Sequence, residues 1–372
     1  MTGGLALVGT VWAGGDAAPL RDHVVLIDPA GRVDRIGPLR AVDVPGAVRR
    51  LGGPDAWIGP GIVDAHVHVA FGAPQDALRY GVVALRDLGA PPVLAAAVRT
   101  SAAPPPGSPH VRVAGPLLTA PGGYPSRSWG SRGFARFVAS ADEARAAVRD
   151  LVGTVDVVKV ALEPAGGQPT PSPDVVRAVV DAAHEAGLRV TAHALTSAMV
   201  TRALDAGVDE LCHTPVEPMT SHLVERVAAA GIPVVSTIET LSGGRSGAPA
   251  NAAALVAAGV PLVYGTDLGN VGTSPGADPR ELHRLADAGL GGWGALRAAT
   301  TLAAELVLGA GAGRIVAGEP ATLVMLPRDP VADPSAWRDP GVVAVAGAFT
   351  TSAAKRRPEL SLWRARGRSG PA

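Results

Sequence analysis

Eight short runs rich in valine and other apolar residues alternate with helical segments between residues 62 and 266, and this alternation limits the fold more than any other sequence feature. Several runs are apolar on both faces, as strands buried in a parallel sheet are. The predicted strands cover residues 62–68, 81–88, 110–115, 155–162, 188–194, 208–213, 233–238 and 260–266.

The segments between these strands carry readable helix ends. Ser140 and Glu143 have the spacing of a capping box. Ser172-Pro173-Asp174 offers an N-cap, a proline at the first helical position and an acid in the first turn. Glycines stand where helices should end before the next strand, at Gly187, Gly207, Gly231 and Gly259. The pattern predicts an α/β fold, a (β/α)8 TIM barrel over residues 59–312.

The two ends of the chain have a different pattern, with short strands and turns. Neither residues 1–58 nor residues 313–354 look sufficient for a domain alone, so we expect them to pair into one small β-sandwich beside the barrel. Residues 355–372 carry six basic residues and one glutamate. We interpret them as a solvated, flexible tail, with a weak contact to an anion as the alternative.

Composition restricts the class of partner. Lysine plus arginine and aspartate plus glutamate both number 33, so a net charge of zero gives no reason to expect nucleic acid or an anionic membrane. The single cysteine, Cys212, excludes an internal disulfide and fits a reducing compartment. The first residues show neither a signal peptide nor a membrane span, which favours a cytoplasmic protein. A homo-oligomer is an alternative that the sequence leaves open.

Histidines at predicted strand ends are the first candidates for chemistry. His66 and His68 are two apart on a strand, so both rings face one side, near the barrel mouth where barrel enzymes act. His193 ends the fifth strand, His213 the sixth, and Asp267 follows the eighth. Each alone could cap a helix, but together they converge on the barrel axis. Histidine and carboxylate ligands there predict a divalent metal, with zinc as the expected ion.

Lys159 is unusual in this composition. It and Lys355 are the only lysines beside 31 arginines, and it lies in the apolar run VDVVKVAL of the fourth predicted strand. A buried lysine paired with an acid is one interpretation. The other starts from the uncharged amine that burial favours, which can capture carbon dioxide to form a carbamate able to bridge two metal ions. Arginine cannot do this, because its guanidinium does not lose its proton. We therefore favour N6-carboxylation of Lys159.

These residues resemble the amidohydrolase superfamily, in particular its imidazolonepropionase-like branch, which includes metal-dependent prolidases. The segments that carry the resemblance extend from the N-terminal sandwich to residue 350 and include IGPGIVDAHVH, GVVALRDLG, VDVVKV, VRAVVDAAHEAGLRVTAHA, AGVDELCH and GVPLVYGTDLG. Two segments differ from the branch pattern. Tyr124 follows Gly122-Gly123 where the branch commonly has histidine, and Cys212 and Thr214 flank His213 where glutamate and glycine are usual. On the strand, Cys212 should face away from His213 as a buried apolar residue.

The resemblance implies a binuclear centre. It assigns His66, His68 and Asp267 to the more buried metal and His193 and His213 to the more exposed one, with carboxylated Lys159 and a hydroxide bridging both. The implied reaction is hydrolysis of an amide or related C–N bond in a dipeptide, N-acyl amino acid or cyclic amide. Asp267 would act as general base and then as general acid.

Other functions stay open at this stage. The same centre could act on a lactone, carbamate or phosphoester, or catalyse a cyclisation or decarboxylation without hydrolysis. A scaffold without catalysis is a further alternative, although such proteins usually lose metal ligands and here all six are present.

Substrate specificity is expected in the loops. After the third strand the sequence offers Tyr124, Arg127, Trp129 and Arg132, and after the seventh it offers Thr240 and Arg245. An arginine there could bind a substrate carboxylate, or it could be a solvated loop charge. Tyr124 could donate a hydrogen bond to a carbonyl oxygen or only pack.

Overall fold

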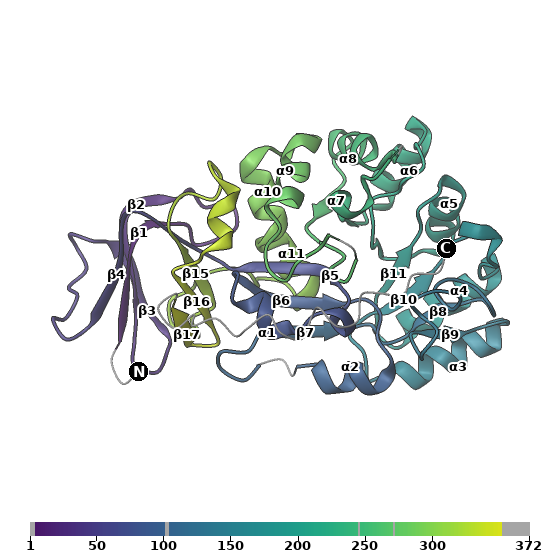
Figure 1. The fold of residues 1–372 in the computed structure, drawn as a ribbon, viewed down its shortest axis with the longest axis horizontal. Helices are drawn as coiled ribbons and strands as arrows, with labels where there is room; N and C mark the ends of the chain where they lie inside the picture. Colours follow the sequence, from purple (N-terminus) through teal and green to yellow (C-terminus); the bar gives the residue numbers. More distant parts are fainter. Residues whose placement is uncertain (1–3, 101–103, 245, 271, 352–372) are drawn as a thin grey trace.

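The computed structural model describes residues 4–100, 104–244, 246–270 and 272–351. Its strands form two seven-stranded sheets and one three-stranded sheet. One sheet, built from both ends of the described chain, lies at the left of Figure 1, and helices lie around the remaining strands. The basic tail at 355–372 and Arg245 lie outside the described residues.

The terminal sheet combines strands from both ends of the chain. Strand β4 (Arg49–Gly59) pairs in parallel with β1 (Leu5–Val11) and antiparallel with β15 (Leu323–Leu326), and this pairing joins the two segments. Leu7, Ile58 and Leu323 are among the apolar side chains buried on this sheet. The β-sandwich and its boundaries stay predictions. The strand order is β17 (Ala348–Thr351), β16 (Val342–Val345), β15 (Leu323–Leu326), β4 (Arg49–Gly59), β1 (Leu5–Val11), β2 (Leu20–Ile27) and β3 (Val33–Pro38).

The other two sheets are parallel, which confirms the α/β prediction. One has the order β5 (Ile62–Val67), β6 (Val82–Asp87) and β7 (His110–Val113). The second has the order β14 (Leu262–Val263), β13 (Val234–Val235), β12 (Glu210–Leu211), β11 (Val190–His193), β10 (Val158–Ala161), β8 (Leu117–Thr119) and β9 (Ala135–Phe137). Each predicted strand contains an observed one, and the observed ladders are shorter. Strands β8 and β9 were not predicted.

Hydrogen bonds connect the edges of the two parallel sheets. On one side the amide of Ala65 donates to the carbonyl of Tyr264 at 3.1 Å. The amide of Asp267 donates to the carbonyl of His66 at 2.8 Å. On the other side the amide of Asp156, just before β10, donates to the carbonyl of Val113 in β7 at 2.8 Å. These bonds place β5 beside β14 and β7 beside β10. Closure into an eight-stranded barrel stays a prediction at this point.

Helix ends follow the sequence signals. The hydroxyl of Ser140 accepts from the amide of Glu143, and that of Ser172 accepts from Val175. Gly207 ends its helix with a left-handed φ of 81°, which glycine adopts without a Cβ clash. The longer helices are α3 (Ala141–Leu151), α4 (Pro173–Glu185), α5 (Ser197–Ala206), α6 (Ser221–Ala230), α8 (Ala248–Ala257), α10 (Gly291–Ala299) and α11 (Thr301–Leu308). The shorter ones are η1 (Val69–Phe71), α1 (Pro74–Leu78), α2 (Pro92–Val98), η2 (Ala165–Gly167), α7 (Ile238–Leu241), α9 (Pro279–Leu285), η3 (Ala286–Leu290) and η4 (Pro334–Arg338).

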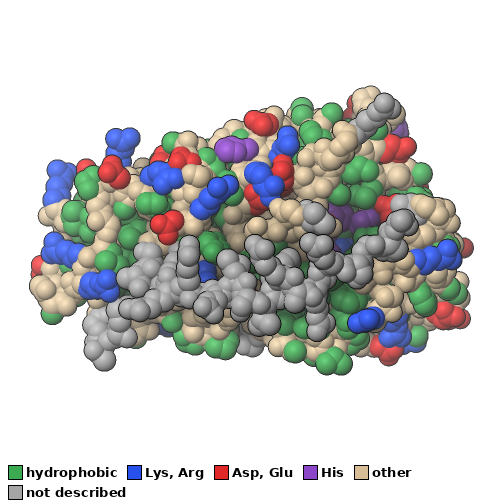
Figure 2. Space-filling view, in the orientation of Figure 1, with side chains coloured by type: hydrophobic (Ala, Val, Ile, Leu, Met, Phe, Trp, Pro, Cys, Tyr) green, Lys and Arg blue, Asp and Glu red, His purple; other side chains and the backbone are tan. Residues whose placement is uncertain are grey.

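Within the described ranges, no helix combines the length and the apolar character that a bilayer crossing requires. Figure 2 shows acidic and basic side chains interspersed on the face that it draws. This distribution agrees with the zero net charge.

Candidate metal centre

Two histidines and an aspartate meet where β5 and β14 end. The Oδ1 atom of Asp267 lies 3.4 Å from Nε2 of His66 and 3.3 Å from Nε2 of His68. All three side chains are buried. Their nitrogen and oxygen atoms are close enough together to hold one metal ion. The strand-end prediction therefore corresponds to a real cluster, because parallel strands bring their carboxyl ends to the same edge.

Lys159 reaches this cluster from β10. Its Nζ atom lies 3.2 Å from Nε2 of His66, and the side chain is 1% exposed. Within the described part of the chain, Lys159 forms no ion pair with a carboxylate. The geometry thus disfavours the interpretation of Lys159 as half of a buried salt bridge.

His213 and His193 extend the cluster. The ring centroid of His213 lies 4.4 Å from that of His66 and 4.7 Å from that of His193. His193 ends β11, and both rings are buried. Contacts between neighbours therefore link all six predicted ligands, His66, His68, Lys159, His193, His213 and Asp267.

In three of these groups, His66, His213 and Asp267, burial and neighbouring charges favour the protonation state that a metal ligand needs. Burial, with the charge of Lys159 as a further cause, lowers the pKa of His66 well below its ordinary value. Burial also lowers the pKa of His213, where His193 adds to the effect. Burial alone would raise the pKa of Asp267, but the nearby His66 and His68 outweigh it and hold that pKa well below its usual range. These shifts favour neutral imidazoles at His66 and His213 and an ionised carboxylate at Asp267.

The donor set fits a divalent metal ion. Oδ1 of Asp267 is buried, and within the described ranges no group donates a hydrogen bond to it. A buried carboxylate oxygen without a donor is costly, and a cation between it and the imidazole nitrogens would remove that cost. Neutral imidazole and carboxylate are zinc ligands.

Aromatic side chains from the loop after β8 cover the histidines. The ring of Tyr124 stacks on His193 with centroids 4.9 Å apart, and Trp129 packs on His68 at 4.8 Å. Nε1 of Trp129 donates to the Tyr124 hydroxyl at 3.0 Å. Phe71 and Phe134 also pack on Trp129. Four of the 13 aromatic residues of the chain thus gather over this cluster.

The other predicted substrate contacts have less support. Arg127 lies on the same loop and is exposed, as is Arg132. The hydroxyl of Thr240 donates to the backbone carbonyl of Thr266 at 2.7 Å, so it supports the segment before Asp267. Their roles in substrate binding stay predictions.

Sequence comparison then identifies the family. The sequence profile of the amidohydrolase family matches residues 57–347, more than three-quarters of the chain. The chain belongs to the amidohydrolase family. Family membership supports an enzyme that hydrolyses C–N bonds. A comparison with curated proteins gave no match.

Solved structures share the fold of this amidohydrolase. A prolidase in complex with N-methylphosphonate-L-proline is 24% identical, with a TM-score of 0.76 over 94% of this chain and 99% of that one. A Xaa-Pro dipeptidase with methionine in its active site is 20% identical, with a TM-score of 0.77 over 94% and 100% of the two chains. A molinate hydrolase is 19% identical, with a TM-score of 0.76 over 100% and 99%.

Sequence reasoning missed three side chains of the amidohydrolase site. Asp64 accepts from the amides of His66 and Thr266, at 3.2 and 3.0 Å, and thereby joins the two segments that carry ligands. Oε2 of Glu163 lies 3.2 Å from Nε2 of His193, and the hydroxyl of Thr237 lies 3.0 Å from Nδ1 of His213. Only Asp64 had a sequence signal, since it precedes His66 by two residues and shares its side of the strand.

The structure corrects the prediction for Cys212. Its sulfur does not face away from His213 but lies within 4.8 Å of ring nitrogens of both His66 and His213. The side chain is buried, as expected, and burial raises the pKa of the thiol to about 11. Strand β12 ends at Leu211, so strand alternation does not apply to residues 212 and 213.

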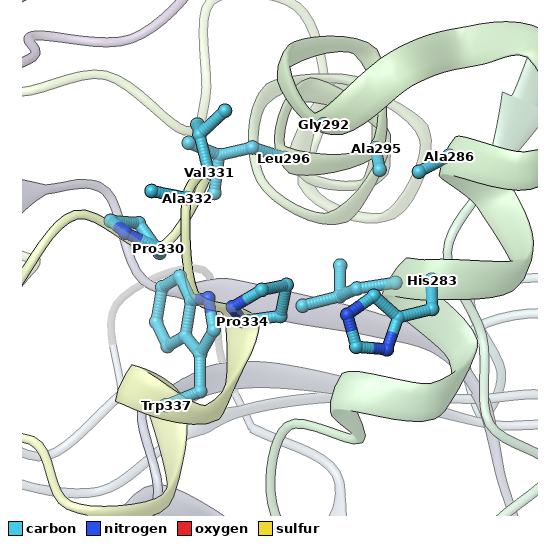
Figure 3. Close-up of a pocket in the computed structure, with 11 residues that line it drawn as sticks. His283, Ala286, Gly292, Ala295, Leu296, Pro330, Val331, Ala332, Pro334 and Trp337 are labelled. Atoms are coloured by element: carbon cyan, nitrogen blue, oxygen red, sulfur yellow. The ribbon is translucent and has the colours of Figure 1, made fainter.

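A separate cavity lies between α9, α10 and η4 (Figure 3). It has a volume of about 280 Å³ and is lined by side chains that include His283, Leu296, Val331 and Trp337. It contains none of the six predicted ligands. The cavity is therefore separate from the candidate metal centre.

Proposed function

We propose that this amidohydrolase is a binuclear metal-dependent hydrolase that cleaves an amide or related C–N bond in a small molecule. The observation that carries the proposal is the buried contact of Asp267 with His66 and His68, with Lys159 beside it. Zinc is the expected ion. The proposal includes closure of the parallel strands into a (β/α)8 barrel over residues 59–312, supported by the hydrogen bonds between the sheet edges. It also includes a small sandwich domain formed by residues 1–58 and 313–354.

In this proposal His66, His68 and Asp267 hold one ion, His193 and His213 hold the second, and carboxylated Lys159 contacts both. When bound, two divalent ions lower the pKa of a water molecule and polarise a substrate carbonyl. The contribution of the protein is to favour neutral His66 and His213 and ionised Asp267 through burial and the neighbouring charges.

Lys159 would carry the bridging group. Its uncharged amine attacks carbon dioxide, a C–N bond forms, and one proton leaves to solvent, so that the side chain ends in a carboxylate. The new carboxylate would be paired by the bound ions, which explains why no protein carboxylate needs to neutralise this buried lysine. An arginine in the same place would have no route to this group.

Asp267 is the proposed proton carrier. Its carboxylate would accept the proton that the attacking water loses and then return it to the nitrogen that leaves. An ionised state near pH 7 is required for the first step, and the lowered pKa supplies it.

We propose a substrate with an apolar group and a carboxylate, such as a dipeptide or an N-acyl amino acid. The rings of Trp129, Phe71 and Phe134 offer an apolar wall beside the histidines, and Tyr124 and Thr240 would contact the polar part. Arg127 and Arg245 are the proposed partners of the carboxylate. The solved prolidase with a proline phosphonate is consistent with such a ligand.

A substrate screen tests the proposed function. Zinc-loaded protein should be incubated with dipeptides, N-acyl amino acids, cyclic amides and lactones in ¹⁸O-labelled water. We expect hydrolysis of at least one amide, with one labelled oxygen in the carboxylate product and loss of the activity on chelation. Products without the label, turnover restricted to lactones, or no turnover by the zinc-loaded protein would contradict the proposal.

A further inference from the structure

Glu163, which is not one of the six predicted ligands, lies at hydrogen-bond distance from Nε2 of His193. It follows β10 by two residues, is 7% exposed, and places Oε2 3.2 Å from Nε2 of His193. A buried carboxylate and imidazole at this distance form a charge-assisted hydrogen bond when Nε2 carries the proton. The second ring nitrogen, Nδ1, then has a lone pair.

The other three histidines are held through the opposite nitrogen. In each of them Nδ1 lies at hydrogen-bond distance from an oxygen outside the ligand set, which leaves Nε2 as the atom directed at the cluster. The pairs are His66 with the carbonyl of Cys212 at 2.8 Å, His68 with that of Gly89 at 3.3 Å, and His213 with the hydroxyl of Thr237 at 3.0 Å. A ligand histidine whose other nitrogen is hydrogen-bonded is fixed in tautomer and ring orientation.

Tyr124 restricts the orientation of the His193 ring plane by stacking on it. Its ring lies nearly parallel to the imidazole, at an angle of 26° and a centroid distance of 4.9 Å. Rotation of the His193 ring out of its plane would lose this stacking, and a 180° flip about the Cβ–Cγ bond would place the Cε1 carbon instead of Nε2 against Glu163. The two contacts together favour one ring orientation.

We propose that Glu163 is a positioning residue that holds His193 as the Nε2-protonated tautomer. The inference rests on the proposed function only for the identity of what Nδ1 of His193 would bind.

The tautomer can be measured without metal or substrate. In metal-free protein with ¹⁵N-labelled histidine, two-bond ¹H–¹⁵N correlation spectra distinguish the two neutral tautomers. We expect His193, assigned by the loss of its signals in His193→Gln, to be protonated at Nε2, and His66 and His68 at Nδ1. Glu163→Ala should shift His193 towards a mixture of tautomers. A wild-type His193 protonated at Nδ1 would overturn the inference.

Metal affinity gives the second readout. Titration of zinc against a competing chelator should show a loss of about 10- to 100-fold for the weaker site in Glu163→Ala, and a smaller loss in Glu163→Gln, whose amide oxygen can still accept from Nε2. Asp209→Asn is the matched control. Oδ2 of Asp209 lies 2.9 Å from Nε2 of His184, a histidine outside the cluster, so this variant should leave the zinc affinity of both sites unchanged.

The outcomes separate the two proposals. If Glu163→Ala retains the wild-type tautomer and zinc affinity, the positioning role is wrong. If Glu163→Gln loses zinc as completely as Glu163→Ala, Glu163 is a metal ligand, and the positioning role is again wrong. If wild-type protein binds no metal but its His193 tautomer depends on Glu163, the positioning role holds and the proposed metal function fails.

Discussion

The Nζ atom of Lys159 lies 3.2 Å from Nε2 of His66, inside the protein and without an ion pair among the described residues. Oδ1 of Asp267 lies 3.4 Å from the same nitrogen of His66. Carboxylation requires an uncharged amine at Lys159, without a carboxylate partner that would hold it as an ammonium ion, and this expectation can be tested directly.

Lys159→Arg should abolish the second metal ion and lower kcat/KM by roughly 1,000-fold or more, because the positive charge is kept while carboxylation becomes impossible. Intact-protein mass spectrometry under native conditions should show the mass of one carbon dioxide on the wild-type chain and not on the variant. Lys355→Arg, which changes the only other lysine, is the matched control. Two metal ions and full activity in Lys159→Arg would contradict carboxylation.

Asp267→Asn should lower kcat/KM by about 100- to 10,000-fold, because the amide keeps the shape of the side chain and cannot accept the proton. Steady-state kinetics should be paired with metal analysis, since loss of a ligand also lowers the metal content. Asp287→Asn, at an exposed aspartate of η3, should behave as wild type. Activity within a few-fold of wild type in Asp267→Asn would remove this residue from the mechanism.

Much of the site follows from sequence, because strand ends are predictable. Once β5, β11 and β14 are recognised as strands of one predicted barrel, His68, His193 and Asp267 are expected at the same end of it. Glu163 has no such marker. It lies two residues past the end of β10, where loop conformation decides the direction of a side chain.

In the fold, too, the positions of the strands were predicted from the sequence, whereas their ends and two short strands were not. The apolar runs identified eight strands, but hydrogen bonding ends the ladders earlier, and β12 has only two residues. This early end explains the wrong direction predicted for Cys212. Strands β8 and β9 are three residues each and flank a Gly- and Pro-rich loop, so neither has a periodic signal.

Arg86→Met should destabilise the protein by about 3–5 kcal/mol, because it leaves the Glu210 carboxylate buried without its partner. The guanidinium donates to both oxygens of Glu210, at 2.9 and 2.6 Å, and both residues are buried. Urea unfolding measures the loss. Arg145→Met, which breaks an exposed ion pair with Asp142, should cost no more than about 1 kcal/mol. Equal losses of stability in the two variants would show that Glu210 tolerates the loss of its buried partner, contrary to this prediction.

Glu281 should make stability depend on pH. Burial raises the pKa of its carboxyl from 4.5 to about 7, against opposing hydrogen bonds from Ser236 and from the amides of Glu239 and Ile238. Between these two values the folded protein holds a proton that the unfolded chain has released. The free energy of unfolding therefore falls as pH rises from about 4.5 to 7, by up to about 3 kcal/mol, and this contribution is constant at higher pH.

The test compares slopes instead of absolute stabilities, because Glu281→Gln places an amide group against one of two backbone N–H donors and is destabilised at every pH. Urea unfolding of metal-free protein across this pH range should give a shallower decline for Glu281→Gln than for wild type. Glu225→Gln, on the exposed side of α6, should retain the wild-type slope. If wild type and Glu281→Gln decline in parallel, the Glu281 carboxyl is ionised in the folded protein, and the hydrogen bonds from the two amides outweigh the cost of its burial.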